Sequence, residues 1–140
     1  MTTHNFSITQ DQLDGLLTLY PNMGKNSDVG KLAVEIAKIY FLSTDDTATF
    51  ITNKNGIDLS TTINGVNENY EIKGTTDKNI SWNKLKVSSQ NCHDHLVNGM
   101  TLIRITNIGS TEMTFCFLKH NEDFELVPEL RWSVIRKKNI

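Results

Sequence analysis

Two acidic residues and a lysine that could take part in catalysis lie near one another in the middle of the sequence, namely Asp58, Glu71 and Lys73. In the stretch NYEIKGTT, residues 69–76, apolar residues alternate with the glutamate and the lysine, which is typical of a β-strand with one apolar and one charged face. An acid and a base two residues apart on one face suit a metal ligand beside a catalytic lysine. The same pattern also occurs on ordinary solvated strands.

The dipeptide Asn64-Gly65 is the strongest hairpin signal in the sequence, because both residue types accept the positive φ of a two-residue turn. If these are the two central residues of the turn, Asp58 faces Glu71 across the hairpin. Facing residues have Cβ atoms about 4.5–5.5 Å apart, and two carboxylates there repel each other unless a cation lies between them. Mg²⁺ is a natural cation for carboxylate oxygens, with Mn²⁺ as a possible substitute.

This set of residues predicts metal-assisted hydrolysis of phosphodiester bonds. A metal ion polarises the phosphoryl group and lowers the pKa of its bound water, and the lysine stabilises the negative charge that develops. The alternative is a solvated hairpin face, since seven Glu and eleven Lys in 140 residues produce about half an E-x-K tripeptide by chance. A single bulge in the hairpin would also break the facing pair.

Helical signals occur in three parts of the chain. Thr9 and Gln12 form a capping box, Ser27 is a good N-cap, and Ser88 or Ser89 caps a third segment. Apolar residues recur at helical spacing after these caps. The sequence therefore predicts helices at residues 10–20, 28–41 and 89–97.

Runs of β-branched and aromatic residues predict the strands between and after these helices. The expected strands are residues 47–53, 56–63, 66–73, 100–108 and 112–120. The final stretch, residues 128–138, fits a short helix or a last strand equally well. This order predicts one α/β domain whose central mixed sheet of about five strands is flanked by helices.

Composition limits the class of protein. The chain has 140 residues, of which 38% are hydrophobic, and no apolar run approaches the roughly 20 residues that cross a bilayer. The first residues lack a secretory signal, and Cys92 and Cys116 form neither a metal spacing nor a disulfide framework. We therefore expect a cytoplasmic protein. The net charge of −2 gives no bulk attraction to nucleic acid.

The motif GID, followed after a hairpin by YEIKGT, resembles the core of the PD-(D/E)XK nuclease superfamily, which includes many restriction endonucleases and the Holliday-junction resolvases. The resemblance covers residues 27–108 and implies a restriction-endonuclease-like fold. On this view residues 1–26 are an N-terminal helical extension, and residues 109–140 are a C-terminal strand and tail.

The resemblance also implies roles for particular residues. Asp58 and Glu71 would bind Mg²⁺, the backbone carbonyl of Ile72 would complete the metal shell, and Lys73 would be the catalytic lysine. Many members place a further glutamate on the preceding helix, where Glu35 is the candidate.

Two of the implied roles have plain alternatives. The common family form "GE" is Gly30-Lys31 in this chain, and a helix-packing or solvent role suits Glu35 about as well. Some members add a polar residue on the helix after the lysine strand, where Gln90 falls. Its alternative is an ordinary residue of a first helical turn.

Two other groups of residues could have functional roles. His93 and His95 in CHDH lie two apart, so on a helix they point to different faces, which favours a structural or exposed role over zinc binding. The basic and aromatic residues of two segments are candidates for DNA contact, either through phosphates or by stacking. These residues are Lys78, Trp82, Lys84 and Lys86, with Arg131, Arg136 and Lys137 in the tail.

The sequence thus predicts a small Mg²⁺-dependent endonuclease, acting on DNA rather than RNA, in a restriction, phage-defence or recombination and repair setting. At this length specificity would come from a homodimer, a partner subunit or the shape of the substrate. The first alternative is a catalytically inactive nucleic-acid-binding or assembly module on the same fold. The second is an interaction domain whose charged hairpin is only solvated.

Overall fold

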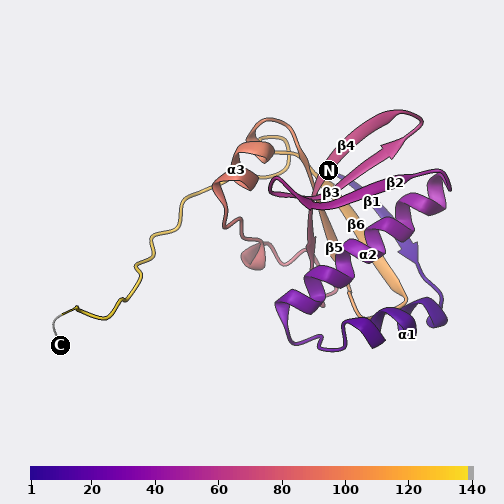
Figure 1. Cartoon of the computed structure of the whole chain (residues 1–140), viewed down its shortest axis with the longest axis horizontal. Coiled ribbons are helices and arrows are strands. Elements are labelled where there is room, and N and C mark those ends of the chain that lie inside the picture. Colours follow the sequence, from indigo (N-terminus) through magenta and orange to yellow (C-terminus); the bar gives the residue numbers. More distant parts are fainter. Residues whose placement is uncertain (139–140) are drawn as a thin grey trace.

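The computed structural model describes residues 1–138, in which six strands form one mixed sheet flanked by three helices (Figure 1). The strands run in the order β1-β6-β5-β4-β3-β2, and β4 and β5 are the parallel pair among antiparallel neighbours. The strands are β1 (Thr2–Ser7), β2 (Thr49–Lys54), β3 (Ile57–Ile63), β4 (Val66–Gly74), β5 (Thr101–Thr106) and β6 (Glu112–Leu118). The helices are α1 (Gln10–Leu19), α2 (Asn26–Thr44) and α3 (Gln90–Val97), with a short 3₁₀ turn η1 (Trp82–Lys84).

The predicted α/β class and the mixed sheet are confirmed, whereas the number of strands was wrong. The sheet has six strands rather than about five, because the first residues form β1 and pair antiparallel with β6 at the edge of the sheet. Residues 1–26 are therefore not only a helical extension. The N-terminal segment is mostly exposed, and its partner lies more than a hundred residues away, so no local pattern marked it as a strand.

The helix signals at Thr9 and Ser89 act as predicted. The Thr9 hydroxyl accepts the Gln12 backbone N–H at 3.1 Å, and the Gln12 side chain accepts the Thr9 N–H at 2.8 Å. The Ser89 hydroxyl accepts the backbone N–H of Cys92 at 3.1 Å. The second helix is longer than expected and begins at Asn26, so Ser27 lies inside it rather than at its cap.

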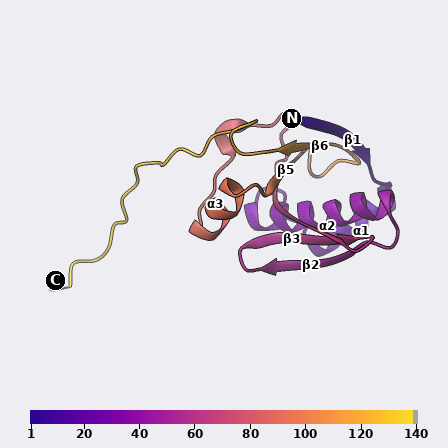
Figure 2. The ribbon, with the colours of Figure 1, turned by 90° about the horizontal axis from the view of Figure 1, so that it is seen from above.

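Each face of the sheet has its own apolar core. Helices α1 and α2 cover one face, where Leu32, Ile36, Leu59 and Ile103 are fully buried. Helix α3 covers part of the other face through Leu96 and its neighbours. Figure 2 shows α3 apart from α1 and α2, at the end of the molecule from which the C-terminal segment leaves. Successive residues of β4 therefore point alternately to the α2 side and to the α3 side.

The last part of the described chain, residues 125–138, forms neither the expected helix nor the expected strand. Leu126 packs against the core and Glu129 pairs with Lys86, and beyond them the chain runs away from the body in both ribbon views (Figures 1 and 2). No helix among the described residues is long and apolar enough to cross a membrane.

The close approach of α2 to β4 at Gly74 gives a stability prediction. A Cβ added to Gly74 would lie 2.8 Å from the Ala33 Cβ and 3.3 Å from the Ile108 Cγ1, so the Gly74→Ala variant must separate helix and strand. We expect a loss of about 1–3 kcal/mol in unfolding free energy, measured by urea denaturation. In Gly15→Ala of α1 the new Cβ meets nothing within 4 Å, so this control should be as stable as the wild type or more so. Equal effects at the two positions would contradict the prediction.

Candidate active site

The hairpin of β3 and β4 sets the register of the site. Asn64 and Gly65 both have positive φ, 52° and 77°, as a two-residue turn of the expected kind requires. The pairing follows the predicted register down to Leu59 opposite Tyr70. The backbone pairing of β3 with β4 ends there. At the next residue, Asp58 Oδ2 accepts a hydrogen bond from the backbone N–H of Ile72 at 2.9 Å. This bond holds the Asp58 carboxylate beside the second strand.

Glu71 lies at the centre of the site. Its side chain is buried, and each of its carboxylate oxygens has a partner. Lys73 Nζ lies 3.4 Å from Oε1, as expected for two residues on one face of a strand. The Cys92 thiol of α3 donates to Oε2 at 2.8 Å. Lys73 of the same strand and Cys92 of α3 therefore both hold the Glu71 side chain in place.

A small cavity opens over these side chains. Its volume is about 230 Å³, and strand residues and the start of α3 line it. The lining residues are Asn53, Gly56, Ile57, Asp58, Glu71, Lys73, Ser88, Ser89 and Cys92. The three side chains predicted to form the core of a site thus share one recess, which has room for a small ligand.

The electrostatics of the recess centre on two neighbouring acids. Burial is the main cause that raises the pKa of Glu71 to about 7, and a hydrogen bond and the charge of Asp58 raise it further. The Cys92 thiol and the charge of Lys73 act in the opposite direction. Burial and the adjacent Glu71 raise the pKa of Cys92 to about 12, so the thiol remains a hydrogen-bond donor at neutral pH. Glu71 therefore retains its proton to a pH close to neutrality.

This arrangement fits a divalent cation, since a metal ion can replace the proton of Glu71 and offset the repulsion between neighbouring carboxylates. The Ile72 carbonyl points to the Asp58 side, because the N–H and C=O of one strand residue share a direction. Among residues 1–138, no three His, Cys, Asp or Glu side chains gather into a ready-made metal cluster. The candidate ligands are thus two carboxylates and one carbonyl, a sparse set of the kind that Mg²⁺ accepts because it keeps several waters.

The raised pKa of Glu71 predicts how stability depends on pH. The folded chain keeps this proton up to about pH 7, whereas the unfolded chain releases it near 4.5. The contribution of Glu71 is therefore complete below pH 4.5 and lost as the pH rises through about 7. Relative to Glu71→Gln, the wild type should lose about 3 kcal/mol of unfolding free energy across this range without metal.

Urea denaturation of both chains in EDTA at several pH values measures this difference. Added Mg²⁺ should stabilise the wild type more in mildly alkaline than in mildly acidic buffer, because binding requires the ionised carboxylate. Parallel stability curves for wild type and Glu71→Gln would contradict the burial of an acid with a raised pKa.

Two residues suggested by the family resemblance lie away from the recess. Glu35 is on α2, which covers the opposite face of the sheet, and its carboxylate pairs with Lys38 at 3.1 Å. Gln90 is exposed at the start of α3 and donates to Asp94 at 2.8 Å. Neither residue lines the cavity. The acid and the amide that family members often add are therefore not part of the recess in this chain.

Cys92 is the residue of α3 that reaches the recess, and sequence reasoning missed it. The two histidines of the motif CHDH do not converge: His93 lies beside Asp94, and His95 contacts the Asn55 carbonyl. The available signal was the spacing of Cys92 and Leu96, four residues apart, which are the buried residues of this helix. That spacing identifies the face of α3 that lies on the sheet.

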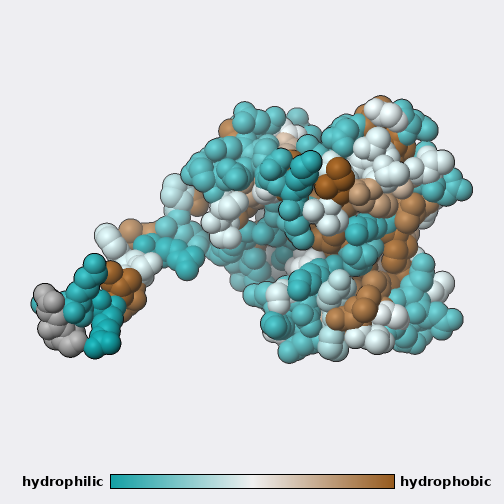
Figure 3. Space-filling view, viewed as in Figure 1, coloured by the Kyte–Doolittle hydropathy of each residue, from teal (hydrophilic) through white to brown (hydrophobic). Residues whose placement is uncertain are grey.

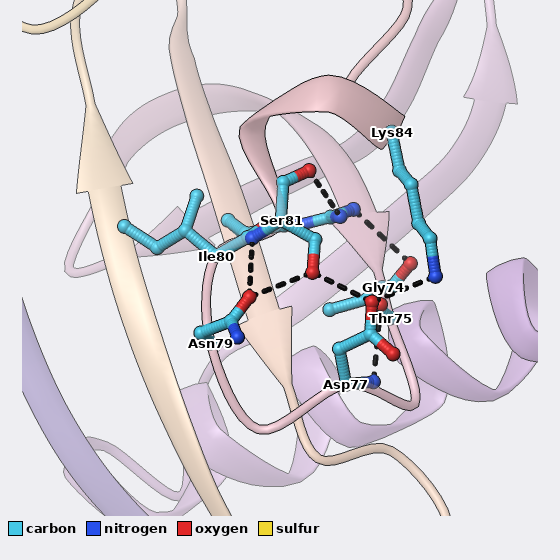
Figure 4. Close-up of polar contacts among 8 residues, drawn as sticks. Gly74, Thr75, Asp77, Asn79, Ile80, Ser81 and Lys84 are labelled. Atoms are coloured by element: carbon cyan, nitrogen blue, oxygen red, sulfur yellow. Dashed lines mark hydrogen bonds and ion pairs between the residues drawn. The ribbon is translucent and has the colours of Figure 1, made fainter.

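Arg104 holds the loop between β4 and α3 against the sheet. Figure 4 shows Gly74 at the end of β4 together with the loop residues Ile80 and Ser81. This arginine of β5 is buried and lies next to Lys73 in the parallel register. Its Nε donates to the Ile80 carbonyl at 2.7 Å, and its Nη1 donates to the Gly74 carbonyl at 3.2 Å. Carbonyl oxygens thus satisfy a buried cation and fix the loop beside the recess.

The four residues of this loop considered for nucleic-acid contact are in different surroundings. Lys84 pairs with Asp77 at 2.8 Å, and Lys86 pairs with Glu129 of the tail. Trp82 is half exposed, and with Lys86 it lines a larger cavity that shares Ser88 and Ser89 with the recess. Lys78 lines a separate hollow beside β1 and β6. Of the four, Trp82 and Lys86 therefore line the cavity that adjoins the recess.

Comparisons with known proteins found no family model that matches the chain, and no curated protein or solved structure significantly similar to it.

Proposed function

We propose that this protein is a metal-dependent nuclease with a restriction-endonuclease-like fold of the PD-(D/E)XK type, cleaving DNA rather than RNA. The observation that carries the proposal is the recess in which Asp58, Glu71 and Lys73 meet, with Lys73 Nζ 3.4 Å from a Glu71 carboxylate oxygen. The order of the surrounding elements supports it, because α2, the β3–β4 hairpin, α3 and β5 follow the arrangement that the sequence motif implies.

Each residue has a role that follows from its contacts. Asp58 and Glu71 would hold a divalent cation, and the Ile72 carbonyl would complete the ligand set. When bound, Mg²⁺ or Mn²⁺ lowers the pKa of a coordinated water and neutralises charge on the phosphate. Lys73 presents its ammonium group to the recess and stabilises the charge that develops on the phosphate oxygens. Cys92 orients Glu71 by donating to one of its oxygens.

A catalytically silent DNA-binding or assembly module is the second candidate. The observation in its favour is that Glu35 and Gln90 lie outside the recess, so the chain offers fewer polar groups there than many nucleases of this type. Such a module would bind DNA in a salt-sensitive way, and its binding would survive the loss of Asp58.

A panel of substrates tests the proposal. Linear, supercoiled, single-stranded and branched DNA, with an RNA control, are incubated with the chain in Mg²⁺, in Mn²⁺ and in EDTA. The proposal predicts cleavage of at least one DNA form that EDTA abolishes. Metal-independent cleavage, or DNA binding without cleavage in either metal, would reject the nuclease and favour the silent module.

A further inference from the structure

The C-terminal segment of the described chain, residues 129–138, exposes an unusual set of apolar side chains. Leu130 is 86% exposed, Trp132 84%, Val134 98% and Ile135 83%. Figure 3 shows hydrophobic patches among hydrophilic ones along a segment that stands away from the body. Scattered exposed apolar residues are normal, but several large ones on one short segment indicate a surface that binds another molecule.

The sequence of this segment suits an extended conformation against a surface. Leu130, Trp132 and Val134 alternate with Arg131 and Ser133, so in a strand-like conformation three large apolar side chains share one side. An extended peptide that docks in this way places alternate side chains into a groove of its partner.

A groove of suitable chemistry lies where the segment leaves the body. Its volume is about 700 Å³, and apolar side chains from the loop, the sheet and the chain after β6 line it. These side chains are Leu85, Val87, Leu102, Leu118, Phe124 and Leu126. Glu129, which pairs with Lys86, and Arg131 form part of one wall of the groove. The apolar residues of the segment after Arg131 do not line it.

Charge indicates which molecule fills the groove. Residues 129–138 hold four Arg or Lys and one Glu, a formal charge of +3, whereas the whole chain carries −2. The remainder of the chain is therefore at −5, so a second copy attracts the basic segment overall, and Glu125 and Glu129 lie in the lining of its groove beside Lys86 and Arg131. Nucleic acid would also attract the charges, but phosphates do not bury the side chains of Leu130, Val134 and Ile135.

We propose that residues 130–138 of one copy dock in this groove of a second copy, with Trp132 as the apolar anchor. Because groove and segment meet at the same place on the molecule, two copies can exchange segments reciprocally about a two-fold axis. The groove shares Ser88 and Ser89 with the candidate active site, so the exchange brings two recesses into one particle. The inference does not depend on the proposed nuclease activity.

Sedimentation velocity of the full chain over a range of concentrations, without DNA or metal, tests the proposal. We expect a particle of twice the chain mass. The double variant Leu130→Ser with Trp132→Ser should raise the dissociation constant at least about tenfold, as expected when anchor residues are lost. Val66→Ser, which changes another exposed apolar residue far from the segment, is the matched control and should leave the mass unchanged.

Cross-linking between two marked chains tests the contact itself. One chain carries Trp82→Cys at the rim of the groove, and the other carries Val134→Cys; the native Cys92 and Cys116 are buried. Oxidation of the mixture should give a mixed disulfide dimer, and a Val66→Cys chain in place of the Trp82→Cys chain should not. A monomer at every concentration, or a double variant that loses DNA affinity with unchanged mass, would overturn the proposal.

Discussion

Replacing Lys73 with alanine is expected to lower the rate of DNA cleavage by about 10²–10³-fold without unfolding the protein. The Lys73 ammonium group lies in the recess, its side chain is 29% exposed, and its ion pair in the site is with Glu71. Its removal takes a positive charge from the place where the phosphate would bind, while the surrounding apolar core stays intact. Steady-state cleavage rates of the two chains measure the effect.

The matched control for this variant is Lys38→Ala. Lys38 also pairs with a glutamate, at 3.1 Å, but on α2 and away from the recess. The Lys38→Ala variant should cleave DNA at the same rate as the wild type. The comparison is best made in alkaline buffer, because the charge of Lys73 lowers the pKa of Glu71 and the variant needs a higher pH to ionise this acid. A Lys73→Ala chain as active as the wild type would remove the lysine from the mechanism.

Glu71→Gln is expected to abolish metal binding and cleavage while making the protein more stable in alkaline buffer. The amide keeps the size of the side chain and removes a buried acid whose pKa is raised mainly by burial. We expect a cleavage loss of at least about 10³-fold. In alkaline buffer without metal, the unfolding free energy of the variant should exceed that of the wild type by about 3 kcal/mol.

Isothermal titration with Mg²⁺ and urea denaturation of the same preparations measure the two effects. Glu35→Gln is the control, since its carboxylate lies outside the recess, and it should change neither metal binding nor cleavage. A Glu71→Gln chain that is both inactive and strongly destabilised would mean that this glutamate is mainly structural. Residues needed for activity often lower the unfolding free energy of a protein.

The features that were predicted correctly are those set by short stretches of sequence. The Asn64-Gly65 turn fixed the hairpin register, and the alternation in β4 placed Glu71 and Lys73 on one face. The caps at Thr9 and Ser89 located two helix starts. Each signal needs only a few neighbouring residues, so it could be interpreted before the fold was known.

The features that were missed depend on partners distant in sequence. The strand β1 forms by pairing with the edge strand β6, and no sequence pattern within Thr2–Ser7 predicts it. Cys92 enters the recess because α3 packs across the end of β4, which the helix sequence alone does not reveal. The absence of regular structure in residues 125–138 reflects how few contacts the body offers to this segment.

Cleavage of supercoiled plasmid by wild type and by Asp58→Asn, purified side by side, tests the central claim most directly. The account predicts Mg²⁺-dependent conversion to nicked or linear DNA by the wild type, inhibition by EDTA, and no conversion by a folded Asp58→Asn chain. Equal conversion by both chains would show that the Asp58–Glu71 recess is not the catalytic centre. No conversion by either, together with no Mg²⁺ binding, would reject the metal site itself.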